Sequence, residues 1–539
     1  MPEQKGAKEQ GNEPAPRGTS AKGVGGLLPD VVVGIAATLL TLPTLLFPFG
    51  RDQGLYFYVA REWVERGAVP YRDVLDHKTP GIYFLHALAI LLFGAKESSI
   101  RILEAIGVLG FGFLAASSMT RVGHAHPRGI RGFGMLTAVL LYFGFFDFWS
   151  SAQSEVWYAG VGIAAVWAAR RIRSVELATV TSCILAGAVP VIKPPGLGFA
   201  VVALVVLFLR VRKEPLLSGR RVRFRLASIA ATGLVAIPGL VLAYFGATRA
   251  LPAMRDIVVG ANAYYVKHEV GAVGSLFAHY KYVLWVFLPF TPVFLGSALV
   301  HLGRALRRRD LASAENEAIG LGFVAAATAA VTVQGKFYFL HWGCFPLALA
   351  FLACAAYVRI SSLTRSEAWA PVSAAAFMTL GYVSTAWISN AATVQRDTLN
   401  AEYRYLSGQY DLPTFQARFQ VAPIGFFYAD SYALGKWLES HTAPTDTVTV
   451  RGFQPEVYAV ANRHHHGRFF WTTFLVNPAR AYKREEWTAE DARDLREHPP
   501  RYLVALTDVH DGLDSPEYYE TRGYRRVTTF PGYTVMELK

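Results

Sequence analysis

Long apolar runs alternate with short charged connections over most of the 539-residue chain. Runs of about 20 residues with few charges are long enough to cross a bilayer as helices. The pattern predicts a polytopic α-helical membrane protein with about eleven spans, at residues 31–48, 100–120, 132–147, 156–170, 176–191, 195–210, 226–246, 281–302, 318–334, 342–358 and 370–390.

One further apolar run, Gly81–Gly94, is short enough to be a re-entrant or interfacial segment rather than a span. Charge decides between these readings, because cytoplasmic loops are rich in Lys and Arg. If 81–94 does not cross, the N-terminal tail and all the basic loops fall on one side; these loops are Arg121–Arg131, Arg170–Arg173, Arg210–Arg225, Arg304–Arg309 and Arg359–Arg365. We therefore predict a plasma (inner) membrane protein with a cytoplasmic N-terminus and an extracytoplasmic C-terminus.

Composition supports this class: 53% of residues are hydrophobic and only 17% are charged. The net charge of +13 resides in the short basic loops, so we expect membrane topology rather than nucleic-acid binding to explain it. The three cysteines lie inside apolar segments, which predicts buried thiols and no disulfide framework.

The pattern also divides the chain. Residues 1–29 lack apolar periodicity and are predicted to be a disordered cytoplasmic tail. Residues 30–390 form the membrane domain, with interfacial helices in a first external loop at 51–99. A connector at 391–427 leads to a small extracytoplasmic α/β domain at 428–539. There, helices are expected at 431–441, 455–463 and 488–497, and strands at 446–452, 501–507, 525–530 and 533–538.

Two carboxylates on the predicted outer face are candidates for acid–base chemistry. Asp52 follows the first span and Glu155 opens a later one. Each also has an ordinary explanation, since Asp52 can form an interfacial ion pair or helix cap and Glu155 can favour a helix N-terminus. The functional interpretation is that Asp52 is a general base for an acceptor hydroxyl and that Glu155 assists it.

Two lysines, Lys78 in HKTP and Lys193 in IKPPG, lie at the outer boundary of apolar runs. A snorkelling lysine explains either position, but a cation there also suits a phosphate-bearing lipid head group. His77 is a further phosphate-binding candidate. Weaker candidates for substrate binding are Tyr56, Tyr83, Tyr265, Lys336 and His341, whose tyrosines equally fit an interfacial aromatic belt.

Other motifs carry little chemistry. The run His464-His465-His466 has no spaced acidic or cysteine partners, so we expect no metal site there. The chain also contains no glycine-rich phosphate loop, HExxH or GxSxG motif. No cofactor is required by this chemistry, although a divalent metal is left open.

Taken in combination, several motifs carry a resemblance to a known family. They are Asp52 with Tyr56 and Ala60, the stretch GAVPYRDVLDHKTPGIYF, LFG at 92–94, Glu155, Lys193 and the run FYFLHWGCFPLALA. The chain resembles the GT-C glycosyltransferases that use polyprenyl-phosphate sugars, a family 39-like group containing protein O-mannosyltransferases and the lipid A aminoarabinose transferase. The resemblance covers most of the membrane region, and family members carry Asp where Glu155 stands.

The resemblance implies that Asp52 is the catalytic carboxylate and that Lys78, helped by Lys193, holds the donor phosphate. The expected function is inverting transfer of a sugar from a polyprenyl-phosphate donor to a hydroxyl of a lipid, glycan or protein acceptor. Two alternatives from other classes are a transporter or flippase of a lipid-linked sugar and a non-catalytic membrane scaffold. A transporter predicts ionisable residues near mid-span.

Overall fold

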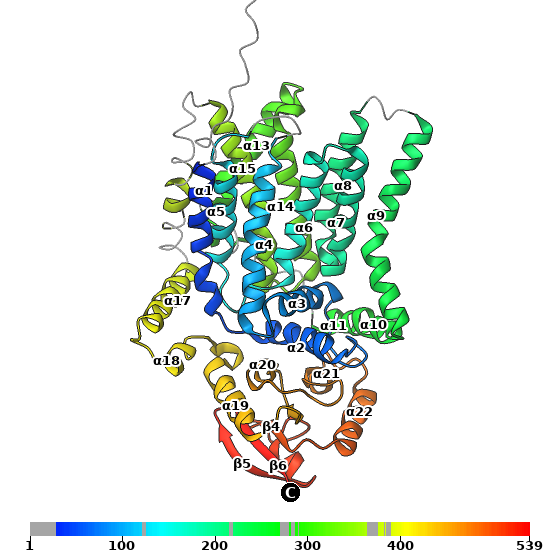
Figure 1. Cartoon of the computed structure of the whole chain (residues 1–539), viewed down its shortest axis with the longest axis vertical. Coiled ribbons are helices and arrows are strands. Elements are labelled where there is room, and N and C mark those ends of the chain that lie inside the picture. The colour runs from blue at the N-terminus through cyan, green and yellow to red at the C-terminus, as the bar shows by residue number, and fades with distance from the viewer. Residues whose placement is uncertain are drawn as a thin grey trace, which may run out of the picture.

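The computed structural model describes residues 28–120, 126–214, 219–269, 280–281, 286–288, 290–363, 374, 376–381, 383 and 390–539. The predicted tail therefore lies almost wholly outside the described residues, and so does most of the predicted span 370–390. Figure 1 shows a bundle of long helices above a smaller C-terminal domain that contains the sheet.

The bundle consists of helices that follow the apolar runs of the sequence. They are α1 (Leu28–Leu39) with η2 (Leu42–Leu46), α4 (Glu97–Ser117), α5 (Ile130–Phe143), α6 (Ser154–Arg171), α7 (Val175–Ile192), α8 (Leu197–Arg212), α9 (Arg220–Ala247), α13 (Phe290–Arg307), α14 (Glu315–Gln334) and α15 (Phe345–Leu363). Each predicted span from 31–48 to 342–358 falls on one of them, 281–302 only in part.

Within the described residues, seven helical segments are long and apolar enough to cross a membrane. Helix α9 illustrates the environment they require: Val235 and Leu240 on it are 61% and 67% exposed. Apolar side chains displayed along a whole helix are stable in lipid rather than in water. The chain is therefore an integral membrane protein.

Two helices that follow the first predicted span, α2 (Arg51–Arg66) and α3 (Pro80–Phe93), do not run with the bundle. Both lie at its lower end, between the membrane helices and the C-terminal domain (Figure 1). Helix α3 has 14 residues and lies across the lower end of the bundle rather than along it. The structure thus keeps 81–94 out of the bundle, and its interfacial location stays a prediction.

The basic connections meet at the opposite end of the bundle. Arg171 Nη1 donates to Thr120 O, the side chain of Asn316 donates to Met119 O, and Tyr357 OH donates to Arg128 O. These contacts join four connections that are far apart in sequence. The charge distribution therefore predicted correctly which loops share one end of the molecule.

Short helices complete the lower end of the bundle. They are η3 (Pro194–Gly196), α10 (Leu251–Arg255), η5 (Asp256–Ala261), α11 (Asn262–Glu269) and η8 (Phe339–Cys344); the remaining short element, η7 (Leu311–Ala314), precedes α14. Proline explains why α7 stops where it does, because Pro194 and Pro195 lack the N–H that would continue the helix.

The first part of the connector is helical, and its last part contains a small two-stranded sheet. Its elements are α17 (Asn390–Leu406), α18 (Leu412–Gln416), β1 (Gln420–Val421), η9 (Ala422–Ile424) and β2 (Phe426–Phe427). Strands β1 and β2 pair antiparallel.

The C-terminal domain has the predicted α/β character. Its elements are α19 (Tyr428–His441), β3 (Val448–Val450), α20 (Glu456–Ala461), α21 (Thr473–Val476), α22 (Arg484–Glu497), β4 (Tyr502–Leu506), α23 (Pro516–Glu520), β5 (Tyr524–Phe530) and β6 (Tyr533–Leu538). The strand order is β3-β4-β6-β5, with β3 and β4 parallel and the other pairs antiparallel. The apolar strand β4 lies between β3 and β6. A strand covered on both faces does not need to alternate apolar and polar residues.

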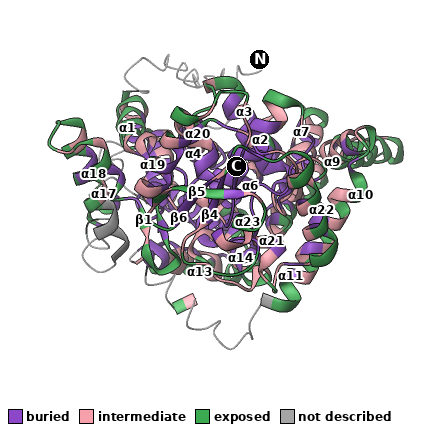
Figure 2. Cartoon of the chain, turned by 90° about the horizontal axis from the view of Figure 1, so that it is seen from below, coloured by how far each residue is buried: buried purple, intermediate pink, exposed green. Residues whose placement is uncertain are grey.

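The C-terminal domain is docked firmly on α2. Gly54 permits this contact, since a Cβ there would lie 2.8 Å from the backbone nitrogen of Glu456 on α20. The Tyr58 hydroxyl accepts a hydrogen bond of 2.8 Å from the backbone N–H of His465. Seen from below, buried residues gather at the centre of the molecule while α9 at the rim is mostly exposed (Figure 2).

The topology predicts which single cysteines react with a membrane-impermeant thiol reagent. The three native cysteines are buried and give a low background. Lys213 and Thr445 are both exposed. Lys213 directly follows α8, which ends away from the C-terminal domain, and Thr445 follows α19 within that domain. We expect Lys213→Cys to react only from the cytoplasmic side and Thr445→Cys only from the other side; reaction of both from one side would contradict the topology.

Candidate active site

The first half of the site lies at the start of α2. Asp52 occupies the first turn of this helix, and Tyr56 follows one turn later on the same face. Lys78 Nζ lies 3.6 Å from Asp52 Oδ1 and 5.4 Å from the centroid of the Tyr56 ring. The Asp52 side chain keeps 26% exposure, so a reacting hydroxyl has access to it.

A buried network holds Lys78 in this position. The Tyr71 hydroxyl donates to Lys78 O at 2.8 Å, and Tyr71 itself has a φ of 72°, a strained backbone for a residue with a side chain. The Asp76 carboxylate accepts hydrogen bonds from the backbone N–H of His77 at 2.7 Å and from Tyr83 OH at 2.8 Å. Burial acts to raise the pKa of Asp76, but Lys78 and these hydrogen bonds hold it well below its usual range.

The second half of the site pairs Glu155 with Lys193. Glu155 lies in the first turn of α6 and Lys193 directly follows α7. Lys193 Nζ is 2.5 Å from Glu155 Oε1, and the two side chains are 17% and 1% exposed. A buried carboxylate with a cation this close forms a charge-assisted hydrogen bond, which fixes both side chains.

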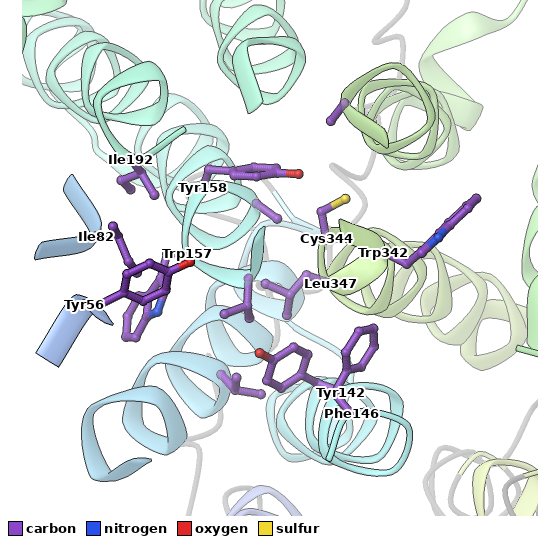
Figure 3. Close-up of a cluster of buried hydrophobic side chains, with 14 of the residues drawn as sticks. Tyr56, Ile82, Tyr142, Phe146, Trp157, Tyr158, Ile192, Trp342, Cys344 and Leu347 are labelled. Carbon is purple, nitrogen blue, oxygen red and sulfur yellow. The ribbon is translucent and has the colours of Figure 1, made fainter. Parts of the chain in front are cut away.

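Two contacts bring the halves together. Thr79 Oγ1 donates to Ile192 O at 2.6 Å, and a Cβ on Gly81 would lie 2.6 Å from Ile192 Cα. Glycine at 81 therefore lets the start of α3 lie against the end of α7, next to Lys193. Figure 3 shows Ile82, Ile192 and Tyr56 close together among buried side chains.

The loop before α6 fixes α2 from the other side. The Gln53 side chain donates to Ser151 O at 2.6 Å, and Tyr56 OH donates to Gln153 Oε1 at 3.0 Å. Burial raises the pKa of Tyr56, and the charges of Asp52, Asp76 and Glu155 raise it further. The Tyr56 hydroxyl thus remains protonated and is surrounded by the carboxylates of both halves.

His77 and Tyr83, two other predicted site residues, both contact Asp76 rather than Asp52. The His77 Nδ1 is 3.0 Å from Asp76 Oδ1, and its ring packs against Tyr265 and Trp471. Burial and the neighbouring Lys78 lower the pKa of His77 to about 4, so its ring is neutral at pH 7 and supplies no charge to a phosphate. Tyr83 is fully buried and supports Asp76.

The remaining predicted residues form a third group. Lys336 Nζ lies 2.8 Å from the centroid of the Tyr265 ring, and Arg480 of the C-terminal domain donates to Tyr265 OH at 2.8 Å. His341 is buried in η8 next to Tyr338. Lys78 and Lys193 are close enough to act electrostatically on both Lys336 and His341.

The three consecutive histidines at 464–466 do not converge. The first ring pairs with Glu62, the second lies 3.1 Å from Thr449 Oγ1, and the third stacks on His498 with 3.8 Å between ring centroids. Across the described ranges, no three His, Cys, Asp or Glu side chains gather as metal ligands do.

Sequence reasoning missed the partners that hold the site. Asp76 is visible as one acid among several, and only its burial between Tyr83 and His77 shows its role. Gln153 and Arg480 belong to no motif. Their contacts join segments about a hundred and more than two hundred residues apart, as the separations of 97 and 215 residues show.

Comparison with known proteins places this arrangement on a known scaffold. No family model matches the chain, and no curated protein matches it. Among solved structures, ArnT from Cupriavidus metallidurans bound to undecaprenyl phosphate matches with a TM-score of 0.53 and 16% identity, over 94% of this chain and 97% of that chain. The apo state of the same protein matches with a TM-score of 0.52 and 16% identity, over the same shares.

The chain has the ArnT fold. This confirms the GT-C architecture that the sequence motifs suggested, including the helical membrane domain and the small C-terminal domain. At 16% identity the ArnT likeness is one of fold, so the roles of individual residues stay predictions.

The paired charges of Glu155 and Lys193 predict non-additive stability. We expect Glu155→Gln and Lys193→Met each to cost about 2 kcal/mol, less than for a fully enclosed pair because Lys193 is 17% exposed. The double variant should cost less than the sum, since it leaves no unpaired charge. Thermal unfolding in detergent measures this, and additive losses would show that the two groups are not coupled.

Proposed function

We propose that the chain is a membrane glycosyltransferase that moves a sugar from a polyprenyl-phosphate donor to an acceptor hydroxyl. The observation that carries the proposal is the joining of two carboxylate–lysine pairs, Asp52–Lys78 and Glu155–Lys193, at one end of a membrane bundle. The ArnT fold supports it, because that ArnT structure was solved bound to undecaprenyl phosphate.

The chemistry needs few groups. A phosphate linked to the anomeric carbon is already a good leaving group, so the chain must supply a base for the acceptor and cations for the departing phosphate. In the proposal, Asp52 removes the proton of the acceptor hydroxyl. The acceptor oxygen then attacks the anomeric carbon as its bond to the phosphate oxygen breaks, which inverts the configuration. The proposed step requires no cofactor.

The other charged groups have supporting roles in this reaction. Lys78 and Lys193 stabilise the charge that develops on the phosphate. Glu155 orients Lys193 through their 2.5 Å contact. His77, being neutral, acts as a support for Asp76 and for the aromatic contacts around Tyr265 rather than as a cation.

A transporter would depend on ionisable residues inside a span. The candidate on α4 is the buried ion pair of Arg101 and Glu104, with 3.8 Å between Arg101 Nη1 and Glu104 Oε2. Its hydrogen bonds are structural. Arg101 donates to Pro48 O and Phe148 O, both at 2.9 Å, and Glu104 accepts from Tyr142 OH at 2.6 Å. The pair ties α4 to the loops on either side, so it gives no support to transport.

The cellular orientation follows from charge. The basic loops at the end of the bundle opposite the C-terminal domain are expected in the cytoplasm. We therefore propose an extracytoplasmic site and C-terminal domain, with the donor reaching the site from the outer leaflet.

Asp52→Asn tests the proposed base. The amide keeps the size of the carboxylate but accepts no proton, so we expect kcat to fall at least about a hundredfold while the donor still binds. Transfer from radiolabelled polyprenyl-phosphate sugars by purified protein measures this. The control is Asp73→Asn, because Asp73 is a half-buried carboxylate of the same loop that pairs with Arg72 at 2.7 Å. Equal rates for Asp52→Asn and wild type would refute the assignment.

Lys78→Met tests the proposed phosphate contact. Losing one charge-assisted hydrogen bond is worth about 1.5–3 kcal/mol, so we expect the KM for the donor to rise ten- to a hundredfold. Arg72→Met removes an exposed cation from the same loop and should leave KM unchanged. A loss of kcat alone, with KM unaltered, would argue that Lys78 acts only on Asp52.

A further inference from the structure

Helix α17 of the connector carries a stripe of exposed apolar side chains. Leu399, Tyr403 and Leu406 are 47%, 65% and 71% exposed. They stand four and three residues apart, which places them on one face of the helix. Apolar side chains that line up on a surface in this way mark a contact with lipid or with another molecule.

The stripe lies between a packed face and a polar face. On the packed side, Ala401 is buried and the Tyr405 ring stacks on Phe415 with 4.5 Å between centroids. On the other side, Asn400 and Arg404 are exposed. With about 3.6 residues per turn, the apolar residues fall between these two sides. A helix that lies in a membrane surface needs this order, because protein, lipid and water each meet a different side of it.

The position of α17 agrees with such a location. The helix contacts η2, the end of the first predicted span, and Ala401 belongs to the same buried cluster as Phe47. It lies beside the lower end of the bundle (Figure 1) and at the rim of the molecule in the view from below (Figure 2). Leu42 in η2 is also exposed. The lipid-facing surface of the first span therefore extends to the element on which α17 packs.

Two arginines beside the stripe share one acceptor. Arg404 Nη1 and Arg418 Nη2 donate to the Tyr410 hydroxyl at 3.3 Å and 3.0 Å. Their Cζ atoms lie 5.5 Å and 5.7 Å from the centroid of the Tyr410 ring. Within the described part of the chain, neither arginine has a carboxylate within ion-pair distance. Two exposed cations held on one phenol oxygen repel each other and attract an anion.

The carboxyl groups of α17 do not oppose an anionic surface. Asp397 Oδ1 lies 3.3 Å from Arg396 Nη2, so these two charges offset each other. Glu402 is on the packed face, and burial raises its pKa to about 8, so its carboxyl group is mostly neutral at pH 7. The charge that remains on this part of the connector is positive.

We propose that α17 is an interfacial helix that binds the membrane surface on the side of the C-terminal domain. Leu399, Tyr403 and Leu406 enter the apolar edge of the leaflet, while Arg404 and Arg418 bind the phosphates of anionic lipid head groups. A guanidinium group suits this partner because its planar fork of donors matches phosphate oxygens. The helix thus anchors the connector between the membrane domain and the C-terminal domain. The inference uses none of the active-site residues and does not depend on the proposed function.

The experiment attaches an environment-sensitive fluorophore to single cysteines of the full chain in lipid nanodiscs. Leu406→Cys places it on the stripe, and the matched control Asn400→Cys places it on the polar face of the same helix. The native cysteines are buried and Leu406 is exposed, so background labelling is low and packing is retained. We expect lipids that carry a doxyl quencher to quench the label at 406 at least about threefold more than the label at 400.

Lipid charge tests the two arginines. In nanodiscs of phosphatidylcholine and phosphatidylglycerol, doxyl-labelled phosphatidylglycerol should quench the label at 406 at least about threefold more than doxyl-labelled phosphatidylcholine. High salt and the double variant Arg404→Gln/Arg418→Gln should remove this preference. The matched control is Arg522→Gln, an exposed arginine of the C-terminal domain whose Cζ lies 3.4 Å from the Tyr518 ring centroid. It should keep the preference.

Three results would overturn the inference. Equal quenching at 406 and 400 would show that α17 does not lie in the membrane surface. A disulfide-linked dimer of Leu406→Cys without lipid quenching would assign the stripe to a second copy of the chain. A preference for the anionic lipid that is absent in wild type, or that survives in Arg404→Gln/Arg418→Gln, would show that the arginines bind no head group. Sugar transfer enters none of these readouts, so failure of the proposed function would leave them unchanged.

Discussion

The site depends on one close contact, where the start of α3 lies against the end of α7. Glycine at 81 allows it, because any side chain there would collide with Ile192. Thr79 fastens it with a hydrogen bond to Ile192 O. Lys78 precedes this contact on one chain segment and Lys193 follows it on the other. This contact is therefore what brings the Asp52–Lys78 and Glu155–Lys193 pairs to one place.

The C-terminal domain is part of this construction. Trp471 Nε1 donates to Leu75 O and Leu75 N–H donates to Arg468 O, both at 2.9 Å, so the domain clamps the loop before Lys78. Arg480 extends the same contact surface to Tyr265. A loop with strained backbone at Tyr71 needs such support, because strain persists only where surrounding contacts outweigh it. The domain thus holds in place the loop that carries Lys78.

Membrane location explains why these groups are paired. A single charge near hydrocarbon is unfavourable, whereas an ion pair with hydrogen bonds is tolerated. Glu155 is buried with Lys193, and Asp52 lies beside Lys78. In the proposed reaction, a phosphate enters between the lysines and the pairs loosen, which leaves Asp52 available to the acceptor.

Much of this architecture was determined by the sequence alone. Apolar run lengths placed the spans, and the basic loops identified the end where they meet. The same charge pattern predicted that 81–94 does not cross with them. Asp52, Lys78, Glu155 and Lys193 were also visible, because charge at a membrane boundary is rare enough to stand out. The tertiary structure alone decided how they pair, that His77 is neutral, and that Asp76, Gln153 and Arg480 support them. The physical reason is that hydropathy and loop charge are properties of consecutive residues. Ion pairing, burial and pKa depend on residues that are distant in sequence and come close only on folding.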